Sequence, residues 1–109
     1  MKVLIVGSGG REHAIAWKVA RSKKVEKIFC APGNGGMQGI GECVPIPVTN
    51  FTKLADFASE KKIDLTIIGP DDPLVLGIVD VFRKRGLRVF GPSKNAAIIE
   101  GSKIFAKDL

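Results

Sequence analysis

The stretch KVLIVGSGGREHAIAW, residues 2–17, joins a predicted strand to a predicted helix through a glycine turn. Residues 3–6 are all Val, Leu or Ile, and such an unbroken apolar run is typical of a strand buried on both faces of a parallel sheet. Gly7, Gly9 and Gly10 break the run before an amphipathic segment begins. Because free N–H groups at the start of a helix favour an anion, the stretch predicts an α/β fold that holds a ligand at this turn.

Short apolar runs and amphipathic segments alternate along the rest of the chain, which predicts a Rossmann-like parallel sheet with crossover helices. We expect strands over residues 2–6, 26–30, 65–68 and 88–90, and a short fifth strand over 42–46. We expect helices over 11–22, 51–62 and 75–85, and a short helix followed by a second one from near Ser102 within 91–109.

Each of the three main predicted helices has an apolar face for docking on the sheet. These faces consist of Ala14, Ile15, Trp17 and Ala20 in the first helix, Leu54, Phe57 and Ala58 in the second, and Val75, Ile78, Val79 and Phe82 in the third. Asn50 and Asp72 are expected N-caps, the second with Pro73 at the first helical position, and Gly86 is expected to end the third helix.

The composition is that of one soluble globular domain. The 109 residues are 45% hydrophobic and 26% charged, and a chain of this size buries roughly two-thirds of the surface that its unfolded form exposes. The longest apolar run near the start, residues 3–6, is too short for a signal-peptide core or a membrane span. We therefore expect a cytoplasmic protein with no membrane partner.

The net charge of +6 at pH 7 is compatible with nucleic-acid binding, but the positions of the cations favour another explanation. They cluster where the three helices are predicted to end and where they complement the helix dipole. These cations are Arg21, Lys23, Lys24 and Lys27, then Lys61 and Lys62, then Arg83, Lys84 and Arg85. The absence of Tyr and a single Trp leave few side chains for base stacking, so we expect no nucleic-acid partner.

The two cysteines, Cys30 and Cys43, are thirteen residues apart in a chain with one histidine. Neither a zinc site nor a disulfide framework has this pattern, so both are predicted to be buried, reduced thiols. There is no P-loop pattern and no carboxylate pair for magnesium outside the turn at Asp71. We expect neither metal ligands nor a catalytic nucleophile or base in this chain.

Four turns follow the predicted strands, and in a parallel sheet all of them lie at the carboxyl edge, where open α/β sheets bind ligands. Their sequences are GSGGRE at 7–12, APGNGG at 31–36, GPDDP at 69–73 and GPSK at 91–94. Glycine lets a ligand approach the backbone, whereas proline stiffens the remainder of each loop. Together the turns predict one cleft.

The first turn departs from the dinucleotide-binding pattern GxGxxG, because Glu12 occupies the third glycine position counted from Gly7. The second predicted strand also leads into Ala31 and Pro32, with no acidic residue for a ribose hydroxyl pair. The loop that follows offers successive amides and the side chain of Asn34, which favours a smaller phosphorylated ligand held by two loops. Three alternatives stay open: glycines that only close tight turns, an NAD(P)-binding module of a dehydrogenase, and a flavodoxin-like interaction domain.

Four charged or titratable side chains near these turns have candidate roles. Arg11 adds a forked cation at the start of the first helix, suited to a phosphate. Asp71 is expected to face the cleft and to accept hydrogen bonds from sugar hydroxyls or an amine, whereas Asp72 serves as the helix cap. His13, one turn into the first helix, either contacts the anion or is packed or hydrated.

Four segments, in this order, resemble the N-terminal, preATP-grasp domain of the phosphoribosylamine-glycine ligase family: VLIVGSGGREHAIAWK, APGNGG, DLTIIGPDDPLVLGIVD and FGPSKNAAIIEGSKIFAKDL. They cover nearly the whole chain. The family has Glu at the position of Asp71 and commonly Ala at that of Asp72, so this chain departs from the pattern there. The resemblance implies a substrate-binding domain over residues 1–100, followed at 101–109 by the start of a truncated ATP-grasp region.

The resemblance also implies a reaction of purine biosynthesis and its partners. ATP phosphorylates the glycine carboxylate, and the amine of 5-phosphoribosylamine attacks the acyl phosphate, which gives glycinamide ribonucleotide, ADP and phosphate. The ATP and Mg sites belong to the downstream ATP-grasp region, so this chain without that region and the C-terminal domain is expected to be inactive. The residues implied to line the phosphoribosylamine pocket are Ser8, Gly9, Gly10, Arg11, Pro32, Gly33, Asn34, Gly69, Pro70 and Asp71.

Overall fold

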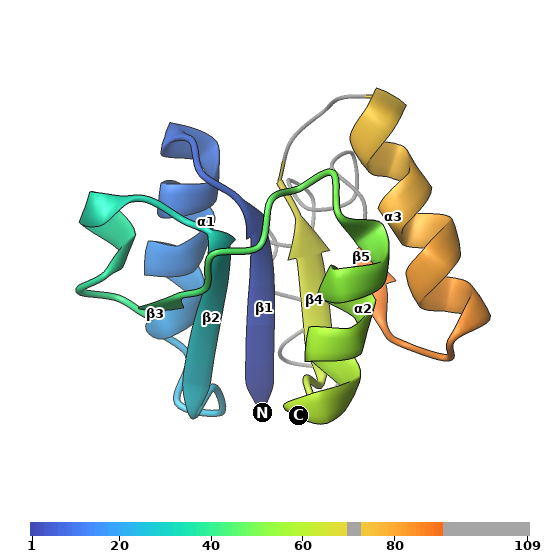
Figure 1. The fold of residues 1–109 in the computed structure, drawn as a ribbon. Helices are drawn as coiled ribbons and strands as arrows, with labels where there is room; N and C mark the ends of the chain where they lie inside the picture. Colours follow the sequence, from blue (N-terminus) through green and yellow to red (C-terminus); the bar gives the residue numbers. More distant parts are fainter. Residues whose placement is uncertain (70–72, 91–109) are drawn as a thin grey trace.

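The computed structural model describes residues 1–69 and 73–90, with the backbone alone at residues 73–76. Within these ranges five parallel strands form one sheet in the order β3-β2-β1-β4-β5 (Figure 1). The strands are β1 (Lys2–Gly7), β2 (Lys27–Pro32), β3 (Glu42–Cys43), β4 (Leu65–Ile68) and β5 (Val89–Phe90). The helices are α1 (Gly10–Ala20), α2 (Phe51–Glu60) and α3 (Pro73–Lys84), with a 3₁₀ turn, η1, at Gly35–Met37. The predicted Rossmann-like fold class is confirmed.

Strand β1 lies at the centre of the sheet, paired with β2 on one side and with β4 on the other. The chain leaves β1 through α1 toward β2, and it leaves β4 through α3 toward β5, so the winding direction reverses between β1 and β4 (Figure 1). In open α/β sheets ligands bind at such a switch point, outside the carboxyl ends of the strands. The topology therefore predicts that a ligand site lies at the carboxyl ends of β1 and β4.

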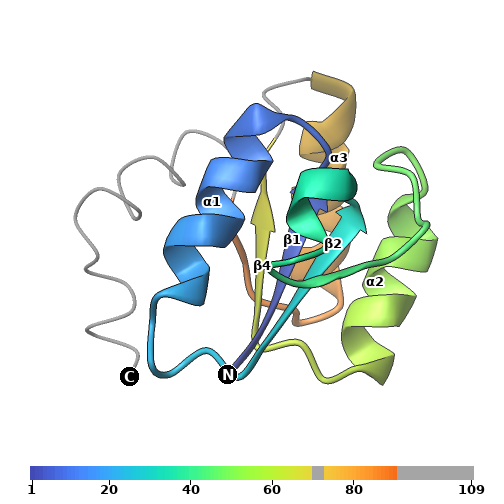
Figure 2. The same cartoon turned by 90° about the vertical axis from the view of Figure 1, so that its left-hand side faces the viewer.

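Helix α1 covers one face of the sheet, whereas α2 and α3 cover the other (Figure 2). Successive residues of β1 alternate between the two core layers: Val3 and Ile5 lie in the layer of α1, and Leu4 and Val6 lie in the layer of α2 and α3. All four side chains are fully buried. Burial on both faces explains the unbroken apolar run from which the strand was predicted.

The predicted buried face of α1 is correct at Ile15 and wrong at its other three residues. The face that packs on the sheet has the i, i+3, i+4, i+7 spacing and consists of Glu12, Ile15, Ala16 and Val19. Ala14 and Ala20 are exposed, and Trp17 is 54% exposed, with the Arg21 guanidinium 4.9 Å from its ring centre. The buried face is predicted from apolar residues alone, so the charged Glu12 is not counted as a buried position. The predicted face is therefore rotated around the helix toward solvent.

The predicted N-cap of α2 and the predicted stop of α3 are confirmed, although α2 ends at Glu60 instead of residue 62 and α3 spans Pro73–Lys84 instead of 75–85. Asn50 caps α2, since its side chain accepts a hydrogen bond from the Lys53 amide at 3.2 Å. Gly86 ends α3 with a φ of +73°, and the Leu87 amide donates to the Phe82 carbonyl at 2.9 Å. Positive φ favours glycine, so this stop signal could be read from the sequence.

Some strand boundaries and one cation differ from the prediction. Strand β2 continues through Pro32, and the strand predicted over 42–46 is reduced to two residues. Lys27, which is grouped with the cations near a helix end but also lies in the strand predicted over 26–30, is the first residue of β2 and forms an ion pair with Glu42 at 3.4 Å. The Asp72 cap, the Val75 side chain, the helices predicted within 91–109 and the boundary near residue 100 lie outside what the structure describes.

Replacing Phe82 by Ala is expected to lower the free energy of unfolding by about 3–5 kcal/mol, because the ring is fully buried where α3 packs on the sheet. Lys84→Ala, at an exposed position of the same helix, is the control and is expected to change it by less than about 1 kcal/mol. Urea unfolding followed by circular dichroism measures both variants. Equal losses would contradict the docking of α3 described here.

Candidate functional site

The turns that follow β1 and β2 and the first residue after β4 meet at one edge of the sheet. The Gly33 amide donates to the Gly7 carbonyl at 3.1 Å, which fixes the turn after β2 to the end of β1. On the other side of β1, the Gly69 amide donates to the Val6 carbonyl at 3.0 Å. We call residues 7–11, 32–36 and 69 together the rim. Segments far apart in the sequence thus surround the end of the central strand.

Asn34 links the first two turns of the rim. Its Nδ2 donates to the Ser8 carbonyl at 2.7 Å, and its Oδ1 accepts from the Met37 amide at 3.2 Å. The second bond caps η1. An asparagine amide has two N–H groups and two lone pairs, so each end keeps further capacity beside these bonds. Asn34, a predicted pocket residue, therefore also shapes the loop on which it lies.

The predicted site residues differ in exposure. Those that the structure describes are exposed at Ser8, Gly9, Gly10 and Arg11, half-buried at Pro32, Gly33 and Asn34, and buried at Gly69. Pro70 and Asp71 lie outside the described residues, so their place in the pocket stays a prediction. His13 packs against the second turn, since a Cβ at Gly36 would lie 2.8 Å from its Cε1. Of the alternatives for His13, the packed one matches this contact.

Glu12 adjoins the rim and is absent from the predicted site residues, although the sequence shows that it replaces a glycine of the dinucleotide-binding pattern. It is only 5% exposed, and its Oε1 accepts a hydrogen bond from the Gly9 amide at 3.1 Å, which occupies an N–H group at the start of α1. The carboxyl group lies between the ends of β1 and β4, where a Cβ at either Gly7 or Gly69 would lie 2.6 Å from its carbon. Glycines at the end of both strands were the available signal that a larger side chain needs this space.

The two cysteines occupy paired positions of β2 and β3 beneath the second turn. Neither forms a disulfide; Cys30 is fully buried as predicted, but Cys43 is only half-buried, because β3 is an edge strand. A Cβ at Gly33, whose φ is +73°, would lie 2.6 Å from Cys43 Sγ, so this turn packs directly on the thiol. Burial and the neighbouring Cys43 raise the pKa of Cys30 to about 11, which keeps it a neutral thiol at pH 7.

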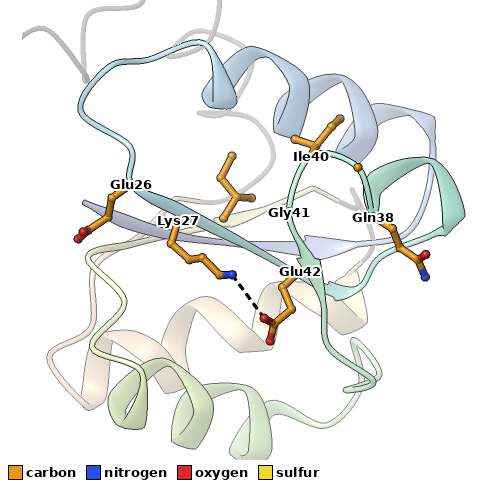
Figure 3. A pocket seen from close by; sticks show the side chains of 8 residues that line it. Glu26, Lys27, Gln38, Ile40, Gly41 and Glu42 are labelled. Atoms are coloured by element: carbon orange, nitrogen blue, oxygen red, sulfur yellow. Dashed lines mark ion pairs between the residues drawn. The ribbon is translucent and has the colours of Figure 1, made fainter.

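A separate hollow of about 380 Å³ lies at the edge of the sheet beside β2 (Figure 3). Its lining comes from the start of β2 and from the segment between η1 and β3: Glu26, Lys27, Ile28, Gln38, Gly39, Ile40, Gly41 and Glu42. Mixed charges face it, including the Lys27–Glu42 ion pair. No predicted site residue is among those eight, so the hollow is distinct from the rim.

No group of three or more His, Cys, Asp or Glu side chains in 1–69 and 73–90 is placed to hold a metal ion. In the same ranges, none of the helices combines the length and the apolar character that crossing a membrane requires.

A doubly wound parallel sheet, with glycine turns joined around the end of its central strand, defines a Rossmann-like α/β domain. Over residues 1–100 the chain matches the family model described as phosphoribosylglycinamide synthetase, N domain. The chain belongs to this family, in agreement with the resemblance seen in its motifs.

The chain is also similar to individual proteins, both in sequence and in fold. It is 61% identical over 109 residues to a phosphoribosylamine-glycine ligase of Caldanaerobacter subterraneus subsp. tengcongensis, covering 100% of this chain and 26% of that protein. It is 56% identical over 110 residues to a protein of the same name from Escherichia coli K12, covering 99% and 26%. The chain therefore spans about a quarter of the length of these relatives. A UDP-D-quinovosamine 4-dehydrogenase from Vibrio fischeri, at a TM-score of 0.58 and 21% identity over 83% of this chain and 75% of that one, shares the fold alone.

Asn34→Ala is expected to lower the free energy of unfolding by about 1–3 kcal/mol, because it removes both the cap of η1 and the bond to Ser8. Asn34→Asp keeps the acceptor for the Met37 amide and loses the donor, so it should lose less. Urea unfolding gives the stabilities, and hydrogen exchange of the Met37 amide reports the cap. Equal protection of that amide in wild type and both variants would contradict the assigned role of Asn34.

The raised pKa of Cys30 makes stability depend on pH at the alkaline end. Because the native thiol has a pKa of about 11 against an ordinary value of 9.0, the folded state holds this proton more tightly than the unfolded chain. Stability is therefore retained below about pH 9 and falls as the pH rises toward 11, by up to about 2–3 kcal/mol.

Cys30→Ala is expected to remove this part of the alkaline loss, whereas Cys43→Ala should keep most of it, since burial is the larger cause of the shift. The measurement is urea unfolding of the three proteins at pH values from 8 to about 11. Parallel pH profiles for wild type and Cys30→Ala would refute the assignment, because other titrating groups are common to both.

Proposed function

We propose that this chain is the N-terminal part of an ATP-dependent ligase that joins glycine to 5-phosphoribosylamine, and that its rim binds the phosphoribosylamine. Family membership supports the ligase, and the bonds that join the rim segments around the end of β1 are the observation that carries the binding role. ATP and Mg would be bound by an ATP-grasp region outside this chain. The protein would act in the cytoplasm together with that region and a C-terminal domain.

The phosphate group is assigned to the outer start of α1. Arg11 is exposed in the first turn of this 11-residue helix, where its guanidinium can pair with phosphate oxygens through two parallel hydrogen bonds. The Gly9 amide already donates to Glu12, so the amides of Gly10 and Arg11 are the ones assigned to the anion. This refines the expectation that the whole helix start is available to a ligand.

The ribose and amine ends of the ligand are assigned to the neighbouring turns. Asn34 lies on the second turn with hydrogen-bonding capacity beyond its two bonds, which suits a ribose hydroxyl. Asp71 is assigned to the amine or to a hydroxyl, as its carboxylate accepts hydrogen bonds from either. Among the described residues, the rim presents no serine, cysteine or histidine arranged as a nucleophile with its base. Its contribution to rate is positional, because fixing the amine near an activated carboxyl group makes the encounter effectively intramolecular.

Ribose 5-phosphate, a stable substitute for phosphoribosylamine, tests this function. At a concentration about tenfold above a millimolar Kd it should stabilise the wild-type chain by about 1.4 kcal/mol, which raises Tm by several degrees. Arg11→Ala should lose this shift, because it removes the phosphate-binding cation. Arg21→Ala, at the far end of the same helix over Trp17, is the matched control and should keep it. Stabilisation that is absent in wild type, or retained in Arg11→Ala, would contradict the proposed site.

A further inference from the structure

The first turn differs from a dinucleotide-binding turn at the third glycine position of the pattern. Glu12 stands where GxGxxG has its third glycine. In dinucleotide-binding sheets that glycine allows close packing of helix and strand, and the pyrophosphate lies at the helix N-terminus near the switch point. Here a buried carboxylate lies between the ends of the two strands that define the switch point.

Two glycines make the space for the Glu12 side chain. Gly7, at the end of β1, has a φ of +136°, and Gly69, directly after β4, is buried. A Cβ at either residue would lie 2.6 Å from the Glu12 carboxyl carbon, and one at Gly69 would also lie 2.8 Å from Oε2. Neither distance leaves room for a methyl group. The side chain and the two glycines are therefore fitted to one another.

The Glu12 carboxylate also accepts a backbone hydrogen bond that a bound anion would otherwise accept at this turn. Oε1 accepts a hydrogen bond from the Gly9 amide at 3.1 Å, as a phosphate oxygen would. A second anion at the same place would find that amide already bonded and the space filled by the Glu12 side chain. In contrast, Ser8, Gly10 and Arg11 are exposed, so the outer side of the helix start lies open to solvent.

We propose that Glu12 determines which class of phosphate ligand the rim accepts. Its side chain keeps a pyrophosphate out of the switch point between β1 and β4, and it leaves the outer start of α1 for a single phosphate. The exclusion of a pyrophosphate follows from the position of the Glu12 side chain and does not depend on the proposed function. The preference for a single phosphate, in contrast, rests on the proposed function. One side chain and two glycines thus direct a fold shared with dinucleotide-binding proteins toward phosphate monoesters.

Calorimetric titration of the chain with NAD tests the exclusion, with ribose 5-phosphate as the second ligand. Glu12→Ala empties the space, so NAD should bind this variant at least tenfold more tightly than wild type. Glu12→Gln has nearly the same volume and still accepts from the Gly9 amide, so its affinity for NAD should stay within twofold of wild type. Circular dichroism verifies folding, and Glu12→Ser takes the place of Glu12→Ala if the alanine variant does not fold.

A folded small-residue variant that binds NAD no better than wild type would overturn the proposal. An equal gain in Glu12→Gln would also overturn it, because occupancy of the space would then not be the cause. Failure of the wild-type chain to bind ribose 5-phosphate is a separate result: it counts against the proposed function and leaves the comparison of NAD affinities valid.

Discussion

Pairing of β1 along both of its edges is the constraint on which the rest of the structure depends. The strand is bonded to β2 from Lys2 to Gly7 and to β4 from Val3 to Val6, so its register fixes both neighbours. All strands are parallel, and therefore every strand ends at the same edge of the sheet. The Gly33 and Gly69 amides continue the ladder just beyond the strands, onto the last two carbonyls of β1. The rim is thus an extension of the sheet, and its geometry follows from the register of the central strand.

The buried carboxylate of Glu12 shows how a local departure from a motif is balanced by its surroundings. A buried charge is costly unless it is bonded or neutralised. Glu12 receives the Gly9 amide and lies in the first turn of α1, where the helix dipole stabilises an acidic group. Space for it comes from Gly7, the last residue of β1, and from Gly69, which directly follows β4. Three residues separated along the sequence therefore act as one unit at the switch point, and none of them can be interpreted without the other two.

The parts of the fold that the sequence predicts well are those set by local patterns. Burial on both faces makes β1 a continuous apolar run and β4 an apolar run interrupted only by the buried Thr66, and Asn50 and Gly86 carry their own cap chemistry. The failures concern properties fixed by distant partners. Glu12 is buried because glycines at the ends of two strands make room for it, and the apolar count consequently misplaces the face of α1. Cys43 is half-buried because β3 lies at the sheet edge, a place that no local pattern specifies. In the same way, the turns could be assigned to one edge from topology, but the bond from Asn34 to Ser8 could not.

The free energies of individual contacts limit the affinity of the rim for a ligand, but they do not limit its selectivity between ligand classes. A helix N-terminus contributes about 0.3–1 kcal/mol toward an exposed anion, and a hydrogen bond to a charged group contributes about 1.5–3 kcal/mol before the cost of association. A net free energy of about 4 kcal/mol corresponds only to millimolar binding. The rim residues at the start of α1 are exposed, so solvent competes for each of these contacts. Since the chain spans about a quarter of the length of its relatives, tight binding under the proposed function requires a second wall from the remaining chain. Steric exclusion by a buried side chain needs no such wall, because it acts through occupied volume. Under the proposed function, the class of ligand can therefore be set within this domain, whereas tight binding needs contacts beyond it.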